Sequence, residues 1–182
     1  MNWRNTEIRY GWLSIGLHWV MLLLLVAVYA CMELRSSFPK GSGLREGLKT
    51  WHFMLGLSVL VLVSVRLAAR FMGTTPIEPA GMPGWQKVLS RLTQLALYGL
   101  MIGMPLLGWV ILSADGRPIP FFGLQLPPLV GESETVAEWA EQIHEGVGTA
   151  GYFFVGFHAT AALFHHYVMR DNTLLRMLPD RR

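Results

Sequence analysis

The sequence contains long stretches without a single charged side chain, and these stretches constrain the fold more than any other feature. No Asp, Glu, Lys or Arg occurs in residues 10–32, 92–114 or 146–169, and a shorter uncharged run covers residues 50–65. About 20 apolar residues span a bilayer core as a helix, so three of these runs are long enough by themselves. The fourth is completed by Arg66 and Arg70, whose long aliphatic stems can extend to the membrane interface.

These stretches predict an all-α integral membrane protein built as a four-transmembrane-helix bundle. We expect one membrane domain over residues 1–182, with spans at approximately 10–33, 50–71, 90–114 and 145–169, and a short polar outer helix at about 133–142. The charged fraction of 15% is well below the value of about 25% for soluble domains. The first span is too long for the core of a cleaved signal peptide, which has roughly 7–15 apolar residues, so we expect it to remain as a helix.

Basic residues are divided unequally between the two ends of this predicted bundle. Ten lie on the side that carries both termini: Arg4, Arg9, Arg66, Arg70, Lys87, Arg91, Arg170, Arg176, Arg181 and Arg182. Five lie on the other side: Arg35, Lys40, Arg45, Lys49 and Arg117. Because Lys and Arg accumulate on the cytoplasmic face, both termini are predicted to be cytoplasmic. The basic isoelectric point then reflects membrane topology, and no nucleic-acid partner is expected.

Four histidines lie at depths that match in two pairs. Span one runs outward and places His18 in the inner half, whereas span two runs back and places His52 near the outer surface. Span four starts outside, so His144 is outer and His158 lies deeper. The predicted pairs are therefore His18 with His158 and His52 with His144. Intramembrane histidines are functional-site candidates because an unpartnered imidazole is unfavourable in hydrocarbon.

The spacing on the fourth span supports the same pairing. His144 and His158 are fourteen residues apart, a rise of about 21 Å with a rotation of only about 40° around the helix. Glycines on that face, Gly148 and Gly151, are expected to leave room for flat macrocycles. Two haems, each with two histidine ligands, fit this pattern better than zinc, which wants four converging ligands, or di-iron, which wants glutamates inside the bundle. A histidine hydrogen-bonded to a neighbouring helix is the alternative for each residue alone.

Any haem would be bound without covalent attachment, because the single cysteine, Cys31, excludes a Cys-x-x-Cys-His motif. We thus expect two haem b groups, with His18 and His158 binding the inner iron and His52 and His144 the outer iron. His165 lies about 10 Å nearer the inner surface than His158. It is a candidate for hydrogen bonding to a quinone, although an interfacial histidine is the simpler interpretation.

The chain resembles the bacterial cytochrome b561 family over nearly its whole length. The resemblance is carried by His18-Trp19, by His52, by the stretch from Trp139 to His158, by His165-His166-Tyr167, and by the tail from Asp171 to Pro179. It implies a four-helix, di-haem b electron carrier of the bacterial inner membrane, with ligands from spans one, two and four. Some similar proteins are superoxide oxidases that pass electrons to ubiquinone. Arg45 and Lys49, beside His52, are then candidates for steering an anionic donor.

The leading hypothesis is transmembrane electron transfer from a periplasmic donor, for which superoxide is a candidate, to membrane quinone. The protein would be either an oxidoreductase of the superoxide:ubiquinone type or a pure electron-carrier cytochrome. The alternative is a haem-bearing membrane anchor subunit of a larger hydrogenase- or formate-dehydrogenase-type complex, whose donor is a partner protein. A small transporter that uses histidines to move protons is a third possibility.

Overall fold

The computed structural model describes residues 3–74, 76 and 83–178. Within these residues, four helices are long and apolar enough to cross a membrane: α1 (Trp12–Arg35), α2 (Gly43–Phe71), α3 (Gly84–Ala114) and α4 (Glu134–Tyr167). The shortest, α1, has 24 residues, which corresponds to about 36 Å of helix and exceeds the roughly 30 Å hydrocarbon core. The predicted four-helix membrane fold is confirmed.

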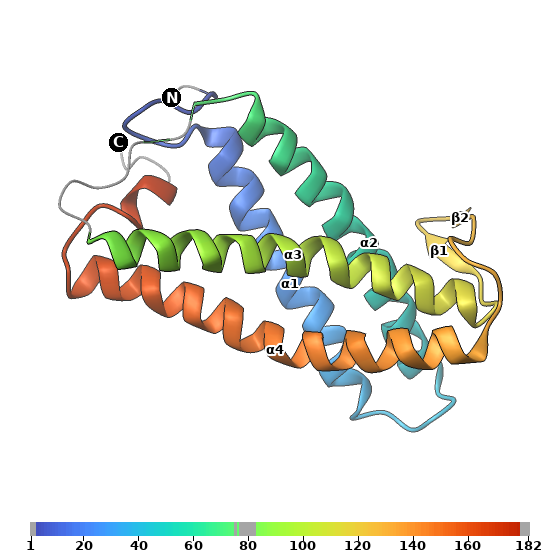
Figure 1. Ribbon diagram of the computed structural model, residues 1–182. Coiled ribbons are helices and arrows are strands. Elements are labelled where there is room, and N and C mark those ends of the chain that lie inside the picture. The colour runs from blue at the N-terminus through green and yellow to red at the C-terminus, as the bar shows by residue number, and fades with distance from the viewer. Residues whose placement is uncertain (1–2, 75, 77–82, 179–182) are drawn as a thin grey trace.

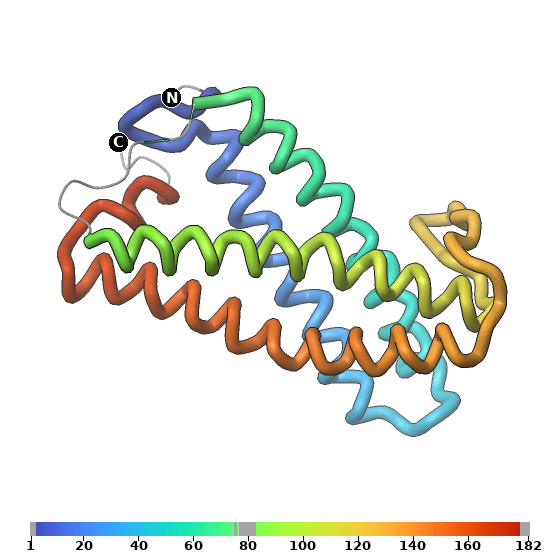
Figure 2. The backbone as a smooth tube through the Cα atoms, in the orientation of Figure 1, coloured from blue at the N-terminus to red at the C-terminus, as the bar shows by residue number. Residues whose placement is uncertain are grey.

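The helices form two antiparallel pairs that cross each other (Figure 1). Helices α1 and α2 pack along one another, as do α3 and α4, and the contact between α2 and α3 joins the two pairs. The smooth trace in Figure 2 shows α1 and α2 passing behind α3 and α4 at a steep angle. The backbone of α4 approaches those of α1 and α2 at isolated residues at most.

The apolar core follows the same division. One cluster joins Met21, Val59, Val63 and Met101, from α1, α2 and α3. A second cluster, at the outer end, joins Leu57, Leu112 and Ile119. Helix α4 contributes to neither cluster; its buried residues are the small Ala137, Ala140 and Gly151. Its face toward α1 and α2 is therefore not filled by interlocking aliphatic side chains.

The polar segment at residues 133–142 does not form a helix of its own. It forms the first turns of α4, which continues from Glu134 to Tyr167 over 34 residues. Ser133 caps this helix by accepting a hydrogen bond from the backbone N–H of Val136 at 3.4 Å, and Glu134 complements the helix dipole. Because no proline interrupts the chain after this cap, the polar turns and the apolar span join without a break.

The outer connection between α3 and α4 contains a small hairpin that the all-α prediction did not include. Strand β1 (Ile119–Phe121) pairs with β2 (Leu124–Leu126) in antiparallel register. The turn residues Phe122 and Gly123 have φ angles of 46° and 85°, and this left-handed backbone suits a tight hairpin turn. Buried Ile119 anchors the hairpin on α2 and α3.

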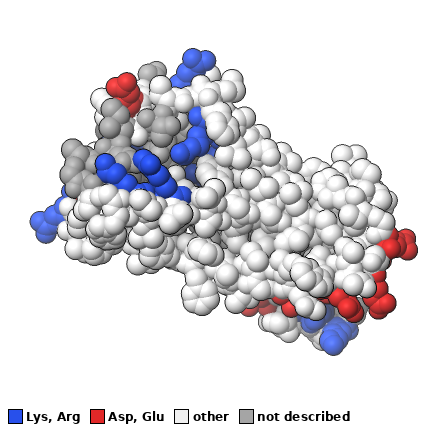
Figure 3. Space-filling view, viewed as in Figure 1, with Lys and Arg blue, Asp and Glu red and all other residues white. Residues whose placement is uncertain are grey.

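The two described ends of the chain meet at one end of the bundle, where the 3₁₀ turn η1 (Leu175–Met177) follows α4. Trp19 donates from Nε1 to the carbonyl of Met177 at 2.8 Å, and Arg9 donates to the carbonyl of Leu178. In Figure 3, Lys and Arg gather toward this end and Asp and Glu toward the opposite one, with an uncharged belt between them. Arg181 and Arg182, which were counted with the inner basic residues, lie outside the described residues.

Candidate haem-binding site

The structure brings the four histidines together in the two expected combinations. The ring centres of His18 on α1 and His158 on α4 are 6.2 Å apart, with an interplanar angle of 68°. Those of His52 on α2 and His144 on α4 are 6.1 Å apart, with an angle of 72°. Each pair joins two helices whose backbones barely touch, so the imidazoles bridge the two helix pairs at two levels.

This spacing fits a metal held between two imidazoles. A metal–imidazole nitrogen bond is about 2.0–2.1 Å long and the nitrogen lies roughly 1.1 Å from the ring centre, so two axial rings have centres about 6.3 Å apart. Among the described residues no three His, Cys, Asp or Glu side chains converge on one point. Each pair could therefore offer a metal two ligands, the number that haem iron requires, since the porphyrin supplies the other four nitrogens.

One ligand candidate is already oriented by a backbone carbonyl. His52 Nδ1 lies 3.1 Å from the carbonyl oxygen of Val28 on α1, which favours the tautomer that carries the proton on Nδ1 and leaves Nε2 free to bind a metal. A carbonyl on a neighbouring helix leaves no signal in the sequence, and the sequence analysis did not identify it.

The ring of His144 has a different environment. Its Nδ1 is buried and has no hydrogen-bond partner among the described residues, although the backbone of Met104 on α3 interacts with the ring. Gly108 lies against this imidazole, because a Cβ there would make an ordinary contact of 3.5 Å with His144 Cε1. Helix α3 thus supplies no ligand candidate but forms the wall that supports one.

Gly151, which was expected to leave room for a macrocycle, packs against side chains of other helices. A Cβ at this position would overlap the hydroxyl of Tyr29 and press on Leu100, so these side chains, from α1 and α3, occupy the space expected for a macrocycle. Tyr29 donates to the carbonyl of Gly148 at 2.9 Å and its ring lies 4.3 Å from that of Tyr152. Gly151 therefore permits a tyrosine bridge between α1 and α4, at a level between the two histidine pairs.

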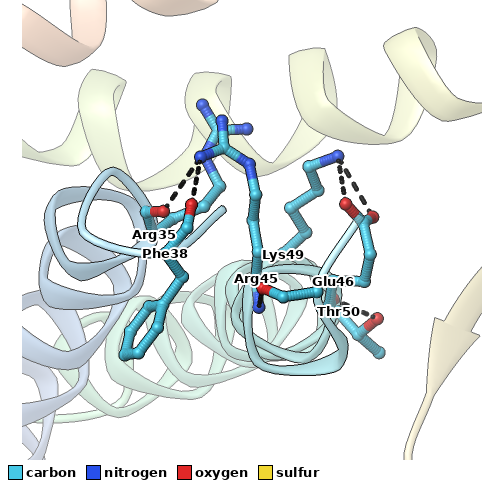
Figure 4. A network of polar contacts seen from close by, with 7 residues as sticks. Arg35, Phe38, Arg45, Glu46, Lys49 and Thr50 are labelled. Carbon is cyan, nitrogen blue, oxygen red and sulfur yellow. Dashed lines mark hydrogen bonds and ion pairs between the residues drawn. The ribbon is translucent and has the colours of Figure 1, made fainter. Parts of the chain in front are cut away.

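The outer cationic candidates, both on the first turns of α2, are held by neighbours around the connection between α1 and α2 (Figure 4). Arg45 donates from Nη1 to the carbonyls of Arg35 and Phe38, at 3.1 and 2.9 Å. Lys49 Nζ lies 3.1 Å from both carboxylate oxygens of Glu46. Arg45 thus closes the loop, and the charge of Lys49 is offset by an adjacent carboxylate that the sequence analysis did not count.

Arg35, the last residue of α1, also belongs to the basic residues that the sequence places beside His52. Its guanidinium lies within electrostatic range of His52, and its Nε is buried without a hydrogen-bond partner in the described part of the chain. Arg35 is therefore placed to act on His52.

His165, the candidate for a quinone contact, pairs with Asp171. Its Nδ1 lies 2.5 Å from Asp171 Oδ2, and the backbone N–H of Thr173 donates to Asp171 Oδ1 at 2.8 Å. Partial burial by itself would raise the pKa of Asp171, but the hydrogen bonds from His165 and Thr173 outweigh it and lower that pKa. The pair gives His165 a fixed orientation at the end of α4.

A turn in the backbone makes this pair possible. Arg170 has a φ of 53°, which reverses the chain just after α4, and the N–H of Asp171 donates to the carbonyl of His165 at 3.1 Å. The sequence analysis quoted Asp171 as part of the tail but assigned it no role, because a positive φ at an arginine is not a recognisable pattern.

Comparison with known proteins agrees with this geometry. A family model described as prokaryotic cytochrome b561 matches residues 9–180. "Cytochrome b561 homolog 1" of Escherichia coli (strain K12) is 37% identical over 174 residues, which cover 96% of this chain and 99% of that protein. "Probable superoxide oxidase CybB" of Yersinia pestis is 35% identical over 175 residues, which cover 96% and 98% of the two chains. "Cytochrome b562" of Cereibacter sphaeroides is 33% identical over 181 residues, with 94% and 96% covered.

The match spans the four membrane helices and all four paired histidines. The chain therefore belongs to the prokaryotic cytochrome b561 family, and it is a multi-pass inner-membrane protein that binds b-type haem and takes part in membrane electron transfer.

Proposed function

We propose that the protein carries electrons across the membrane with two b haems, from a periplasmic donor to membrane quinone. His52 and His144 would bind the outer haem, and His18 and His158 the inner one. The observation that carries the proposal is the recurrence of one spacing, 6.1 and 6.2 Å between ring centres, at two levels that are about 21 Å apart along α4.

When bound, the haems supply the one-electron chemistry, and the protein sets their position and potential through ligation, hydrogen bonding and burial. Val28 would keep His52 in the tautomer that binds iron, and Gly108 lies against the ring of His144 as part of the wall formed by α3. Helix α4 would supply one ligand at each level, so the spacing of its two histidines fixes how far apart the two levels lie.

The direction of electron flow follows from the proposed topology, in which both termini are in the cytoplasm and His52 lies near the periplasm. An electron moving inward works against a negative-inside potential by about 2.3 kcal/mol per 100 mV. The donor must therefore be more reducing than the acceptor by at least that margin. Superoxide as donor is supported by the name of the relative from Yersinia pestis, a probable superoxide oxidase.

The acceptor is proposed to be ubiquinone near His165. The short contact with Asp171 favours a proton on His165 Nδ1 and leaves Nε2 to exchange a hydrogen bond with a quinone oxygen. A side chain that is 17% exposed, at the inner end of α4, is accessible to a ligand that diffuses in the bilayer.

The haem assignment is tested by stoichiometry and by loss of ligands. A pyridine haemochrome assay of the purified protein should give two haems per chain. His52→Ala or His144→Ala should remove one spectral component, and His18→Ala or His158→Ala the other. If His18→Ala and His52→Ala removed the same component, the proposed pairing would be wrong. For the acceptor, His165→Ala should slow quinone reduction without altering the haem spectrum.

A further inference from the structure

Arg66 on α2 lies at the level of the inner histidine pair. It follows His52 by fourteen residues, the same separation as that of His144 and His158 on α4. It is therefore about 21 Å further along α2 than His52 and rotated by only about 40°. The same face of α2 therefore carries His52 at the outer level and Arg66 at the inner level.

The surroundings of Arg66 leave its charge without a compensating anion. The guanidinium lies within electrostatic range of both His18 and His158, and it lies 6.0 Å from the ring centre of Tyr98 on α3. No carboxylate among the described residues pairs with it. A charged side chain inside a membrane bundle is unfavourable unless it is paired, and the half-buried Arg66 has only an aromatic ring.

We propose that Arg66 binds a propionate carboxylate of the inner haem. This rests on the proposed di-haem function and adds a residue that holds the inner haem without binding its iron. Haem b carries two propionates, and a guanidinium can bind a carboxylate through two parallel hydrogen bonds. Because its guanidinium lies at the inner level and within electrostatic range of both imidazoles, it could reach the edge of a porphyrin bound between them. Its charge also favours the reduced haem, because reduction adds an electron nearby.

The test is a spectroelectrochemical redox titration of the purified holoprotein and three variants. Arg66→Gln removes the charge and the fork, Arg66→Lys keeps the charge, and Arg70→Gln removes a charge one turn further toward the surface. We expect Arg66→Gln to lower the reduction equilibrium constant of one haem at least tenfold, equivalent to about 59 mV for one electron. That haem should be the one lost in His18→Ala. Arg66→Lys should retain most of the potential, and Arg70→Gln should shift neither haem as far.

A second measurement separates propionate binding from a general effect of charge. In apoprotein reconstituted with iron protoporphyrin, Arg66→Gln should weaken haem binding at the inner site, whereas with the dimethyl ester, which has no free carboxylate, it should leave the affinity unchanged. An equal loss of affinity for the two porphyrins would refute propionate binding.

Other outcomes of these measurements separate propionate binding from its alternatives. Loss of the inner haem alone in Arg66→Gln, with retention in Arg66→Lys, supports the proposal. If Arg66→Gln and Arg70→Gln shifted the reduction potential equally, Arg66 would only contact lipid headgroups, and the proposal would be overturned. If the wild-type protein held fewer than two haems, the di-haem function would itself fail. Two haems in the wild type with no selective effect of Arg66 would reject this inference alone.

Discussion

The tyrosine bridge between α1 and α4 makes Gly151→Ala a sharp test of the structure. The new Cβ would overlap the Tyr29 hydroxyl and come within 3.1 Å of a Leu100 methyl. Tyr29 would have to move, and would lose its hydrogen bond to the Gly148 carbonyl and its ring contact with Tyr152. Overpacking alone is unfavourable by about 1–3 kcal/mol, the hydrogen bond is worth about 0.5–1.5 and the aromatic pair about 0.5–1.5, so we expect a destabilisation of about 2–6 kcal/mol.

The free energy of unfolding can be measured by SDS titration in mixed micelles, with haem absorbance followed in parallel. Gly156→Ala is the matched control, because it lies on the same helix and a Cβ there would meet nothing within 4 Å. In a Tyr29→Phe background the overlap is relieved, so Gly151→Ala should lose much of its effect. The reasoning is refuted if Gly151→Ala and Gly156→Ala unfold alike, or if removing the Tyr29 hydroxyl leaves the penalty of Gly151→Ala unchanged.

Three further predictions concern the ends of the bundle and the wall of the outer site. The pKa of Asp171 is lowered in the folded chain, so its stabilising contribution is complete above the unfolded value of 3.8 and is lost as pH falls from there through the lower folded pKa. Asp171→Asn should therefore flatten the loss of thermal stability below about pH 4, and an unchanged slope would contradict this. Glu46→Gln removes the carboxylate that offsets the charge of Lys49, so it should speed haem reduction by superoxide at low ionic strength. This gain in rate should disappear near 1 M salt, where the Debye length is about 3 Å. A gain in rate that persists at high salt would exclude electrostatic steering. Gly108→Ala should leave the outer haem spectrum intact, because its Cβ would make an ordinary 3.5 Å contact with His144. Gly108→Leu should instead displace the His144 ring and remove the outer haem component of the spectrum. If the two variants had the same spectrum, α3 would not be the wall that supports His144.

The pairing of the histidines could be predicted from the sequence because it depends on two regular quantities. One is the alternating direction of successive spans, which places His18 and His52 at opposite depths. The other is the helical repeat, which places His144 and His158 on one face. Both are properties of straight helices in a layer of known thickness, so they hold before any side chain is packed, and the structure places the rings accordingly.

The groups that orient the histidines could not be predicted, because they depend on how the helices cross. The carbonyl of Val28 is one of many equivalent carbonyls on α1, and only the register between α1 and α2 selects it for His52. The pairing of His165 with Asp171 depends on one arginine with a positive φ. The hairpin was missed because Phe122-Gly123 lacks the Asn or Asp usual at such turns, and because its first strand contains Pro120 and follows Pro118.

The packing of α4 explains how one helix can carry a ligand candidate at each level. Helix α4 packs along α3, and its contacts with α1 and α2 are made by long side chains, the imidazoles and the tyrosine bridge, and not by close-packed backbones. A helix that packed tightly on three neighbours would have no room for a macrocycle beside it. A helix with no neighbour would not hold two imidazoles at a fixed separation. Because α3 supports α4 along one side and leaves the other open, the spacing of His144 and His158 along a single rigid helix becomes the spacing of the two sites.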